Sequence, residues 1–149
     1  MPITPLHFGV MAPINHFAPG AVSTVSFILV NLWIDGRAIE SALLGLPLPG
    51  HPPLTHSLMG ALGIALIVSL FGFRSRKWIY GAFLGAVSHV LLDTLVHSEM
   101  LPFFPLAGNP AYMGWMEPLS IVLVPLTIWF TAQCVSGIGA WFRRRHEAS

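Results

Sequence analysis

The sequence predicts an all-α fold, a polytopic transmembrane helical bundle of about four spans with a short N-terminal helix that is half-depth or interfacial. Hydrophobic residues make up 54% of the 149 residues and charged residues only 9%, whereas a soluble domain has about 25% charged residues. The mean hydropathy is +0.72. Several largely uncharged stretches are long enough to cross a bilayer core of ~30 Å. No repeat or linker divides the chain, so we expect one membrane-embedded domain over residues 1–149.

The N-terminal part predicts a helix that does not cross the membrane. Residues 6–18 are too few, because an α-helix rises only ~1.5 Å per residue. Pro19-Gly20 is typical of a turn, so this helix is expected to fold back against the next segment. That segment is apolar over residues 21–34, and its helix can continue past Asp35 to Gly45.

Three longer apolar segments follow, at residues 57–73, 78–97 and 119–142. Basic residues cluster between the first two of these segments and again after the last one. An even number of crossings separates the two clusters, so both can lie on the cytoplasmic side of an inner membrane. This places the C-terminus in the cytoplasm and the loops at 36–55 and 98–118 outside. The basic residues are Arg74, Arg76, Lys77, Arg143, Arg144 and Arg145.

Ionisable residues at membrane depth are costly, so their positions indicate function. If the segments flanking the first basic cluster pair antiparallel, His56 and Asp93 both lie roughly 27–28 Å from the connecting turn. His7 and Asp35 come level in the same way about the Pro19-Gly20 turn. The connectivity therefore predicts that several ionisable residues converge at the outer end of the bundle. These are Asp35, His56, His89 and Asp93, with His7 as a further member.

One face of the 78–97 segment carries Gly81, Gly85, His89, Asp93 and His97 at steps of four. Residues at this spacing share a helix face, and glycines allow a neighbouring helix to approach closely. The stripe is therefore expected to face the bundle interior. Imidazole and carboxylate groups suit zinc, manganese or iron(II). Together, His7, His56, His89, Asp35 and Asp93 could hold one ion, or two ions bridged by a carboxylate.

Two sequence elements carry a resemblance to a known family. "HPPLTHSLMG" at 51–60 contains Thr-His-Ser, and "GAVSHVLLDTL" at 85–95 contains Ser-His-x-x-x-Asp, followed by "LPFFPL" at 101–106. "PLHFG" at 5–9 and "NLWIDG" at 31–36 supply an early His and an early Asp. The chain thus resembles the predicted membrane-bound metal-dependent hydrolases, small multi-span proteins of bacteria and archaea. The resemblance implies metal ligation by His56, His89 and Asp93, and also by Asp35 and His7.

The leading hypothesis is a hydrolase in which a metal-activated water attacks a phosphoester, ester or amide of a lipid or lipid-linked substrate at the outer face. Zinc is the expected metal, with manganese and iron as alternatives. Asp35 or His97 would act as the general base. His51, His97 and Glu99 are interpreted as interfacial residues, with contacts to metal ligands or substrate as the alternative.

Two other classes of function remain open. The same cluster could bind a cation in passing, as in a metal-ion transport or handling protein, or it could only join helices in a non-catalytic membrane scaffold. The lipid bilayer is the expected partner. A net charge of +1 provides no global basic field for nucleic acid.

Overall fold

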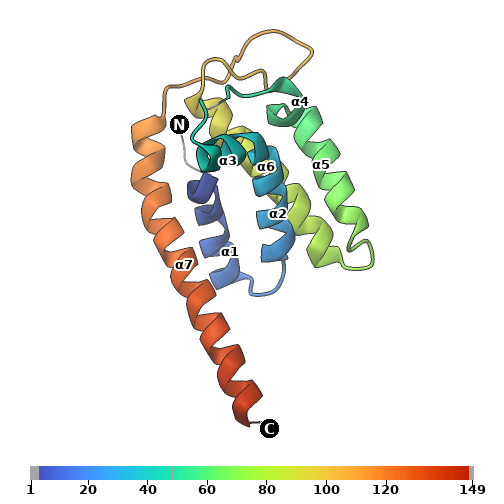
Figure 1. Cartoon of the computed structure of the whole chain (residues 1–149), viewed down its shortest axis with the longest axis vertical. Helices are drawn as coiled ribbons and strands as arrows, with labels where there is room; N and C mark the ends of the chain where they lie inside the picture. Colours follow the sequence, from blue (N-terminus) through green and yellow to red (C-terminus); the bar gives the residue numbers. More distant parts are fainter. Residues whose placement is uncertain (1–3, 48, 148–149) are drawn as a thin grey trace.

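The computed structural model describes residues 4–47 and 49–147, and over these residues the chain forms helices, turns and loops without any strand. The predicted all-α class is therefore confirmed. The helices run from one end of the bundle to the other, with α3 and α4 near one end and the C-terminus at the opposite end (Figure 1). They are η1 (Thr4–Val10, a 3-10 helix), α1 (Met11–Phe17), α2 (Thr24–Ile34), α3 (Gly36–Leu44), α4 (Pro53–His56), α5 (Leu58–Leu70), α6 (Arg76–Val96) and α7 (Met116–Glu147).

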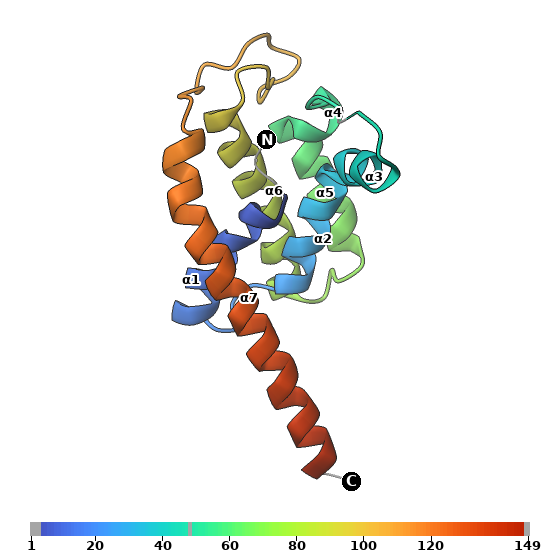
Figure 2. The ribbon, with the colours of Figure 1, turned by 60° about the vertical axis from the view of Figure 1, so that its left-hand side comes forward.

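Helix α6 is the centre of the bundle, and α2 and α5 both pack against it. Its buried small residues Ala82 and Ala86 join the main core. The N-terminal pair η1 and α1 lies between α7 and the other helices (Figures 1 and 2). Contacts with the centre of the bundle thus come from three directions, which places residues on several faces of α6 inside the protein. The main core consists of Val30, Ile34, Ala61, Ile64, Ala65, Val68, Ala82, Ala86, Val90 and Met100.

Close packing of α2 on α6 depends on the predicted glycine stripe. A Cβ atom at Gly81 would collide with the Ser23 carbonyl and the Ser26 hydroxyl, and one at Gly85 would lie 2.9 Å from the Phe27 carbonyl oxygen. Because glycine lacks a Cβ, the two backbones can approach at this point. The prediction that the stripe faces the bundle interior is confirmed, and at the two glycines the neighbouring helix is α2.

Among the described residues, two helices are long and apolar enough to cross a membrane: α6, and the part of α7 from Met116 to Arg145. Helices α2 and α5 have 11 and 13 residues, which corresponds to roughly 17 and 20 Å, less than the ~30 Å of a bilayer core. The structure therefore supports two candidate spans, and the expectation of about four is not confirmed. The segment expected over residues 21–45 is interrupted by a break, and the helix in the 57–73 segment ends at Leu70.

One break lies at Asp35. The helix expected to continue from residues 21–34 to Gly45 is instead divided into α2 and α3, with Asp35 between them at φ −87° and ψ 6°. Helix α3 ends as expected at Gly45, which has a φ of 66°. The division leaves Asp35 at the end of α2, with 8% of its surface exposed.

A second break lies at Ser57, which has the extended φ and ψ of −100° and 159°. It separates the single-turn helix α4 from α5, and its hydroxyl accepts a hydrogen bond from the Gly60 amide at 3.1 Å. A serine in this position satisfies an amide that the first turn of a helix leaves unpaired. The break turns the last residue of α4, His56, into the bundle, where 5% of its surface is exposed.

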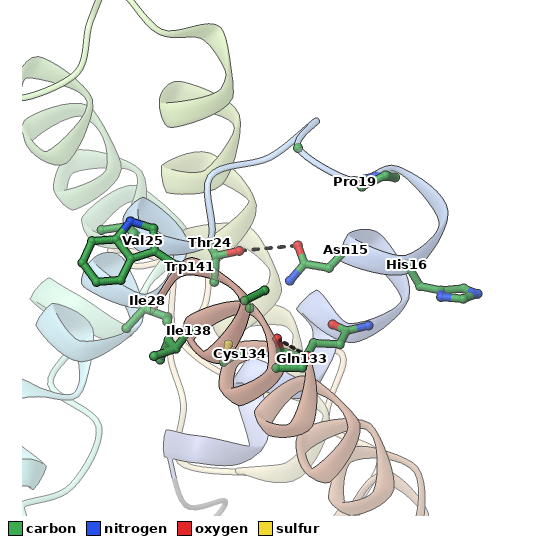
Figure 3. Close-up of a pocket in the computed structure, with 14 residues that line it drawn as sticks. Asn15, His16, Pro19, Thr24, Val25, Ile28, Gln133, Cys134, Ile138 and Trp141 are labelled. Carbon is green, nitrogen blue, oxygen red and sulfur yellow. Dashed lines mark hydrogen bonds between the residues drawn. The ribbon is translucent and has the colours of Figure 1, made fainter. Parts of the chain in front are cut away.

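The N-terminal segment is short and helical, as predicted, and Gly20 forms the expected turn with a φ of 73°. Its contacts are mainly with the long helix α7, whereas the segment after the turn, which was the expected partner, contacts it less. The Gln133 side chain of α7 donates to the Ala12 carbonyl at 3.1 Å. A groove of about 1170 Å³ separates α1 and α2 from the C-terminal part of α7 (Figure 3). It is lined mostly by apolar groups and lies toward the C-terminal end of the molecule.

The surface of the long helices is apolar. Water would penalise such a continuous apolar face, whereas lipid does not. The second half of α7 also extends beyond the rest of the bundle (Figure 2). Side chains that are more than half exposed include Leu66 and Leu70 on α5 and Ile121, Ile128 and Val135 on α7.

Candidate metal centre

Four ionisable residues from three elements meet beside α6. His89 and Asp93 lie one turn apart on α6, Asp35 follows α2, and His56 ends α4. Each offers one ligand atom, and these atoms all lie within 4.8 Å of one another. At most 8% of the surface of any of the four residues is exposed. The structure thus brings together Asp35, His56, His89 and Asp93, at the height that the connectivity predicts. We call them the inner cluster.

Distances within the inner cluster match those between ligands of one metal ion. His56 Nε2 lies 3.1 Å from Asp35 Oδ1, and His89 Nε2 lies 3.4 Å from the same oxygen and 3.2 Å from Asp93 Oδ2. Two ligand atoms on a tetrahedral zinc ion lie about 3.3–3.4 Å apart, because each lies ~2.0–2.1 Å from the ion. Three pairs of donor atoms therefore already have a spacing close to that of ligands on a single ion, and all four atoms lie within 4.8 Å of one another.

Asn31 determines which ring nitrogen of a neutral His89 carries the proton. The Asn31 amide nitrogen donates to the Phe27 carbonyl at 2.8 Å, which turns its side-chain oxygen toward His89 Nδ1 at 2.9 Å. Because that oxygen can only accept, His89 Nδ1 must carry the proton. In the neutral imidazole, Nε2 then presents a lone pair to the two carboxylate oxygens. His89 Nε2 is buried and has no hydrogen-bond partner among the described residues.

Three electron-rich atoms therefore converge in a site shielded from water. A neutral Nε2 and two carboxylate oxygens repel one another, and a buried charge without compensation is unfavourable. A cation between them removes the repulsion: either a proton on Nε2 or a metal ion. Two carboxylates and neutral imidazoles form a donor set with the charge and chemistry that a divalent borderline ion prefers. The residues present fit such an ion.

His56 is held on its other side by Thr55, whose hydroxyl lies 2.9 Å from His56 Nδ1. When the hydroxyl accepts from Nδ1, the lone pair of Nε2 faces Asp35 and is available to a cation. A hydrogen bond to the non-ligating nitrogen is the usual way in which proteins orient a histidine ligand. Thr55 and Asn31 therefore perform equivalent tasks for the two histidines.

His7 lies against the inner cluster from η1. Its Nε2 is 3.3 Å from Asp93 Oδ1, and its ring stacks on that of His89 with centroids 4.2 Å apart. Asp93 thus faces the two stacked histidines, with a different oxygen toward each. The predicted partner of equal height was Asp35, whereas the structure places His7 against Asp93. Its role as a ligand remains a prediction.

His97, predicted as a possible general base, lies outside the inner cluster, whereas Asp35, the other candidate, lies within it. His97 caps α6 and approaches His51 and Glu99, with one ligand atom from each of the three residues within 4.8 Å of the others. Burial lowers the pKa of His51, and the neighbouring His97 imidazole lowers it further. A neutral His51 imidazole keeps a lone pair. We call His51, His97 and Glu99 the rim cluster.

Sequence reasoning missed Asn31 and Thr55 as residues that orient the histidines. A signal was present for Asn31, since a polar amide inside an apolar run stands one helical turn before Asp35. Sequence reasoning also placed His51 and Glu99 at the membrane interface as separate residues and did not predict that they meet. Their meeting with His97 depends on two loops, whose paths no periodicity predicts.

Comparison of the chain with known protein families identifies one to which it is similar. The model of the family described as YdjM inner membrane protein matches residues 22–149 of the chain. No curated protein and no solved structure matches at a significant level. The matched region includes all residues of the inner and rim clusters, while His7 precedes it. Because the match extends over most of the sequence, the chain belongs to the YdjM inner membrane protein family.

Proposed function

We propose that the protein is a membrane-bound metal-dependent hydrolase whose centre is the inner cluster. The observation that carries the proposal is His89 Nε2, a buried nitrogen without a hydrogen-bond partner that faces carboxylate oxygens of both Asp35 and Asp93. In the neutral imidazole this nitrogen lacks a donor, and a metal ion would occupy the place of one. Strongly interacting ionisable groups in one buried site are typical of functional centres.

Zinc is the metal that this donor set suits best, with manganese and iron(II) as alternatives. His56, His89, Asp35 and Asp93 would hold it. A divalent ion here would supply Lewis acidity and activate water for attack on a phosphoester, ester or amide. Such an ion also offsets the cost of burying two carboxylates.

The chain itself supplies orientation and proton transfer. Asn31 and Thr55 hold the imidazoles of His89 and His56, and His7, stacked on His89, contacts the other oxygen of Asp93. A general base must lie within hydrogen-bond reach of the proton that it removes. Asp35 meets this requirement more directly than His97, because Asp35 belongs to the inner cluster. We therefore favour Asp35 as the base.

A lipid or lipid-linked substrate at the outer face is supported by the surroundings of the cluster. Leu54 and Trp33, neighbours in sequence of His56 and Asp35, are 77% and 50% exposed. The α5–α6 turn and the C-terminus, which carry the basic residues, lie at the end of the bundle opposite α4 (Figure 1). Basic residues favour the cytoplasmic side, so we propose that the centre faces outward.

The alternative of a transport protein is less well supported. A transport pathway needs polar groups that continue across the membrane. Toward the other end of the bundle, the buried residues of α6 below His89 are Gly81, Ala82, Gly85 and Ala86. The two glycines lie against α2 and the two alanines belong to the main core, so this face of α6 offers no polar groups for a route.

Hydrolysis and metal binding can be tested on the full chain in lipid nanodiscs. We expect zinc in the purified protein by elemental analysis, and cleavage of at least one member of a panel of phosphomonoesters, phosphodiesters, esters and amides. Asp93→Asn should lose both, whereas His16→Asn, which changes an exposed histidine of α1, should retain both. Metal-loaded protein that cleaves nothing in the panel would argue against catalysis, and Asp93→Asn protein with undiminished metal would argue against the centre.

A further inference from the structure

The rim cluster is built from two loops and one helix end. His51 lies in the loop before α4, His97 caps α6, and Glu99 follows it. Glu99 Oε1 lies 3.3 Å from His51 Nδ1 and 3.4 Å from His97 Nδ1. The two imidazole rings lie 4.1 Å apart between centroids. One carboxylate oxygen is thus shared between two histidine nitrogens, again at the separation of two ligands on one ion, about 3.3–3.4 Å.

His97 is buried and the side chain of His51 is largely covered, while the carboxylate is accessible. The side chains of His51 and His97 are 10% and 9% exposed, compared with 59% for Glu99. His51 Nδ1 and His97 Nε2 are buried atoms without a hydrogen-bond partner among the described residues. Buried imidazole nitrogens normally have partners. His51 Nδ1 makes no hydrogen bond but lies beside Glu99 Oε1, as does His97 Nδ1, so a cation bound by the carboxylate and the two imidazoles would satisfy these atoms.

The loop after α6 is held in place, so the rim cluster does not depend on a mobile segment. The Asn109 amide donates to the carbonyl oxygens of Thr94 and His97, both at 2.8 Å. The Pro102 carbonyl accepts from the Leu58 amide at 2.8 Å. These bonds attach the loop to the ends of α6 and α5. A site whose supporting residues are fixed before binding loses less entropy when a ligand arrives.

We propose that the rim cluster is a second divalent-cation site, separate from the inner cluster. Two imidazoles and one carboxylate suit zinc, manganese or iron(II), and three protein ligands leave coordination positions open. Because Glu99 is solvent-accessible, the ion exchanges with solution more readily than one in the inner cluster. The two sites share no residue but are neighbours, with the rings of His51 and His56 5.1 Å apart. The second site does not depend on hydrolysis.

The test is a titration of metal-free protein in nanodiscs with zinc, monitored by calorimetry, together with cobalt(II) absorption spectra. Wild-type protein should bind about two equivalents. Glu99→Gln and His97→Asn should each lose about one equivalent or weaken one binding step by about tenfold or more. Glu117→Gln removes another exposed carboxylate and should bind as wild type does. Glu99 is exposed and lies in a loop, so Glu99→Gln is compatible with an intact fold.

Asp35→Asn distinguishes this proposal from the proposed function. It removes a ligand of the inner cluster, and the rim cluster should still bind about one equivalent. The second site is overturned if wild-type protein binds about one equivalent, or if Glu99→Gln and His97→Asn both titrate as wild type does. Those results would leave the inner cluster and its hydrolytic role intact. Conversely, if zinc binding is lost at the inner cluster but kept at the rim cluster, the proposal of a second site is supported.

Discussion

Asn31 is the residue on which the chemistry of His89 depends. Its amide orientation is set by the Phe27 carbonyl, and the orientation in turn places the proton of His89 on Nδ1. Nε2 is left with a lone pair that faces Asp35 and Asp93. A single buried amide thus converts a histidine that could have served as a donor into a potential ligand. Residues that hold a ligand in this way have measurable effects on metal affinity.

Asn31→Ala should therefore weaken zinc binding by about 10–100-fold, which is the usual cost of losing a hydrogen bond to a histidine ligand. Without the amide, His89 can place its proton on either nitrogen and can rotate. Competition with a chromogenic chelator measures the change. Asn15→Ala removes an asparagine of α1 that bonds to Thr24, far from the inner cluster in the fold, and should leave the affinity unchanged. Equal affinity of Asn31→Ala and wild type would show that the amide does not orient the ligand.

At the scale of the elements, the contact between α2 and α6 positions Asp35 and Asn31 against His89. Gly85→Ala would introduce a methyl group 2.9 Å from the Phe27 carbonyl oxygen and 3.1 Å from the Asn31 amide nitrogen. Overpacking of this kind costs about 1–3 kcal/mol. The substitution should reduce both the thermal stability in detergent and the zinc affinity, because α2 must move away.

Gly63→Ala provides the matched control for this substitution. Gly63 lies within α5, and a Cβ there would meet nothing within 4 Å. Alanine is favoured over glycine inside a helix by roughly 0.5–1 kcal/mol. Gly63→Ala should leave zinc affinity unchanged and the midpoint of thermal unfolding equal or higher. If both glycine variants behave alike, the close approach of α2 does not control the inner cluster.

The breaks at Asp35 and Ser57 show where sequence periodicity stops being informative about elements. Asp35 stands in a stretch that is compatible with continued helix, so the sequence predicts a longer helix there, whereas Ser57 coincides with the predicted start of the 57–73 segment. Tertiary contacts decide otherwise, since the Asp35 carboxylate and the His56 imidazole meet only when each chain segment turns. The apolar segments, the Pro19-Gly20 turn and the glycine contact could be predicted, because they depend on local composition and spacing.

At the scale of the whole molecule, the two ends of the bundle differ in charge and chemistry. The inner and rim clusters gather histidines and carboxylates near α4, while Arg143, Arg144 and Arg145 end α7 at the far side (Figure 1). Membrane insertion favours basic residues in the cytoplasm. This difference in charge between the two ends predicts a single orientation in the inner membrane.

A reporter fused to the C-terminus tests this orientation. Green fluorescent protein should fluoresce there and alkaline phosphatase should be inactive, because we expect that end in the cytoplasm. Replacement of Arg143, Arg144 and Arg145 by glutamine should increase the fraction of inverted chains, since these residues contribute to the charge bias. An active phosphatase fusion on the unmodified chain would reverse the proposed orientation and place the inner cluster at the cytoplasmic face.

The sequence by itself determined the helical class, the membrane character and the identity of the residues that meet in the inner cluster. These follow from hydropathy, from the spacing of four between His89 and Asp93, and from chain lengths between turns, all of which are local or additive properties. Only the tertiary structure decided the number of long spans, the orientation of His89 by Asn31 and the meeting of His51, His97 and Glu99. These depend on breaks, loop paths and contacts between distant segments, whose free energies arise only when the helices pack.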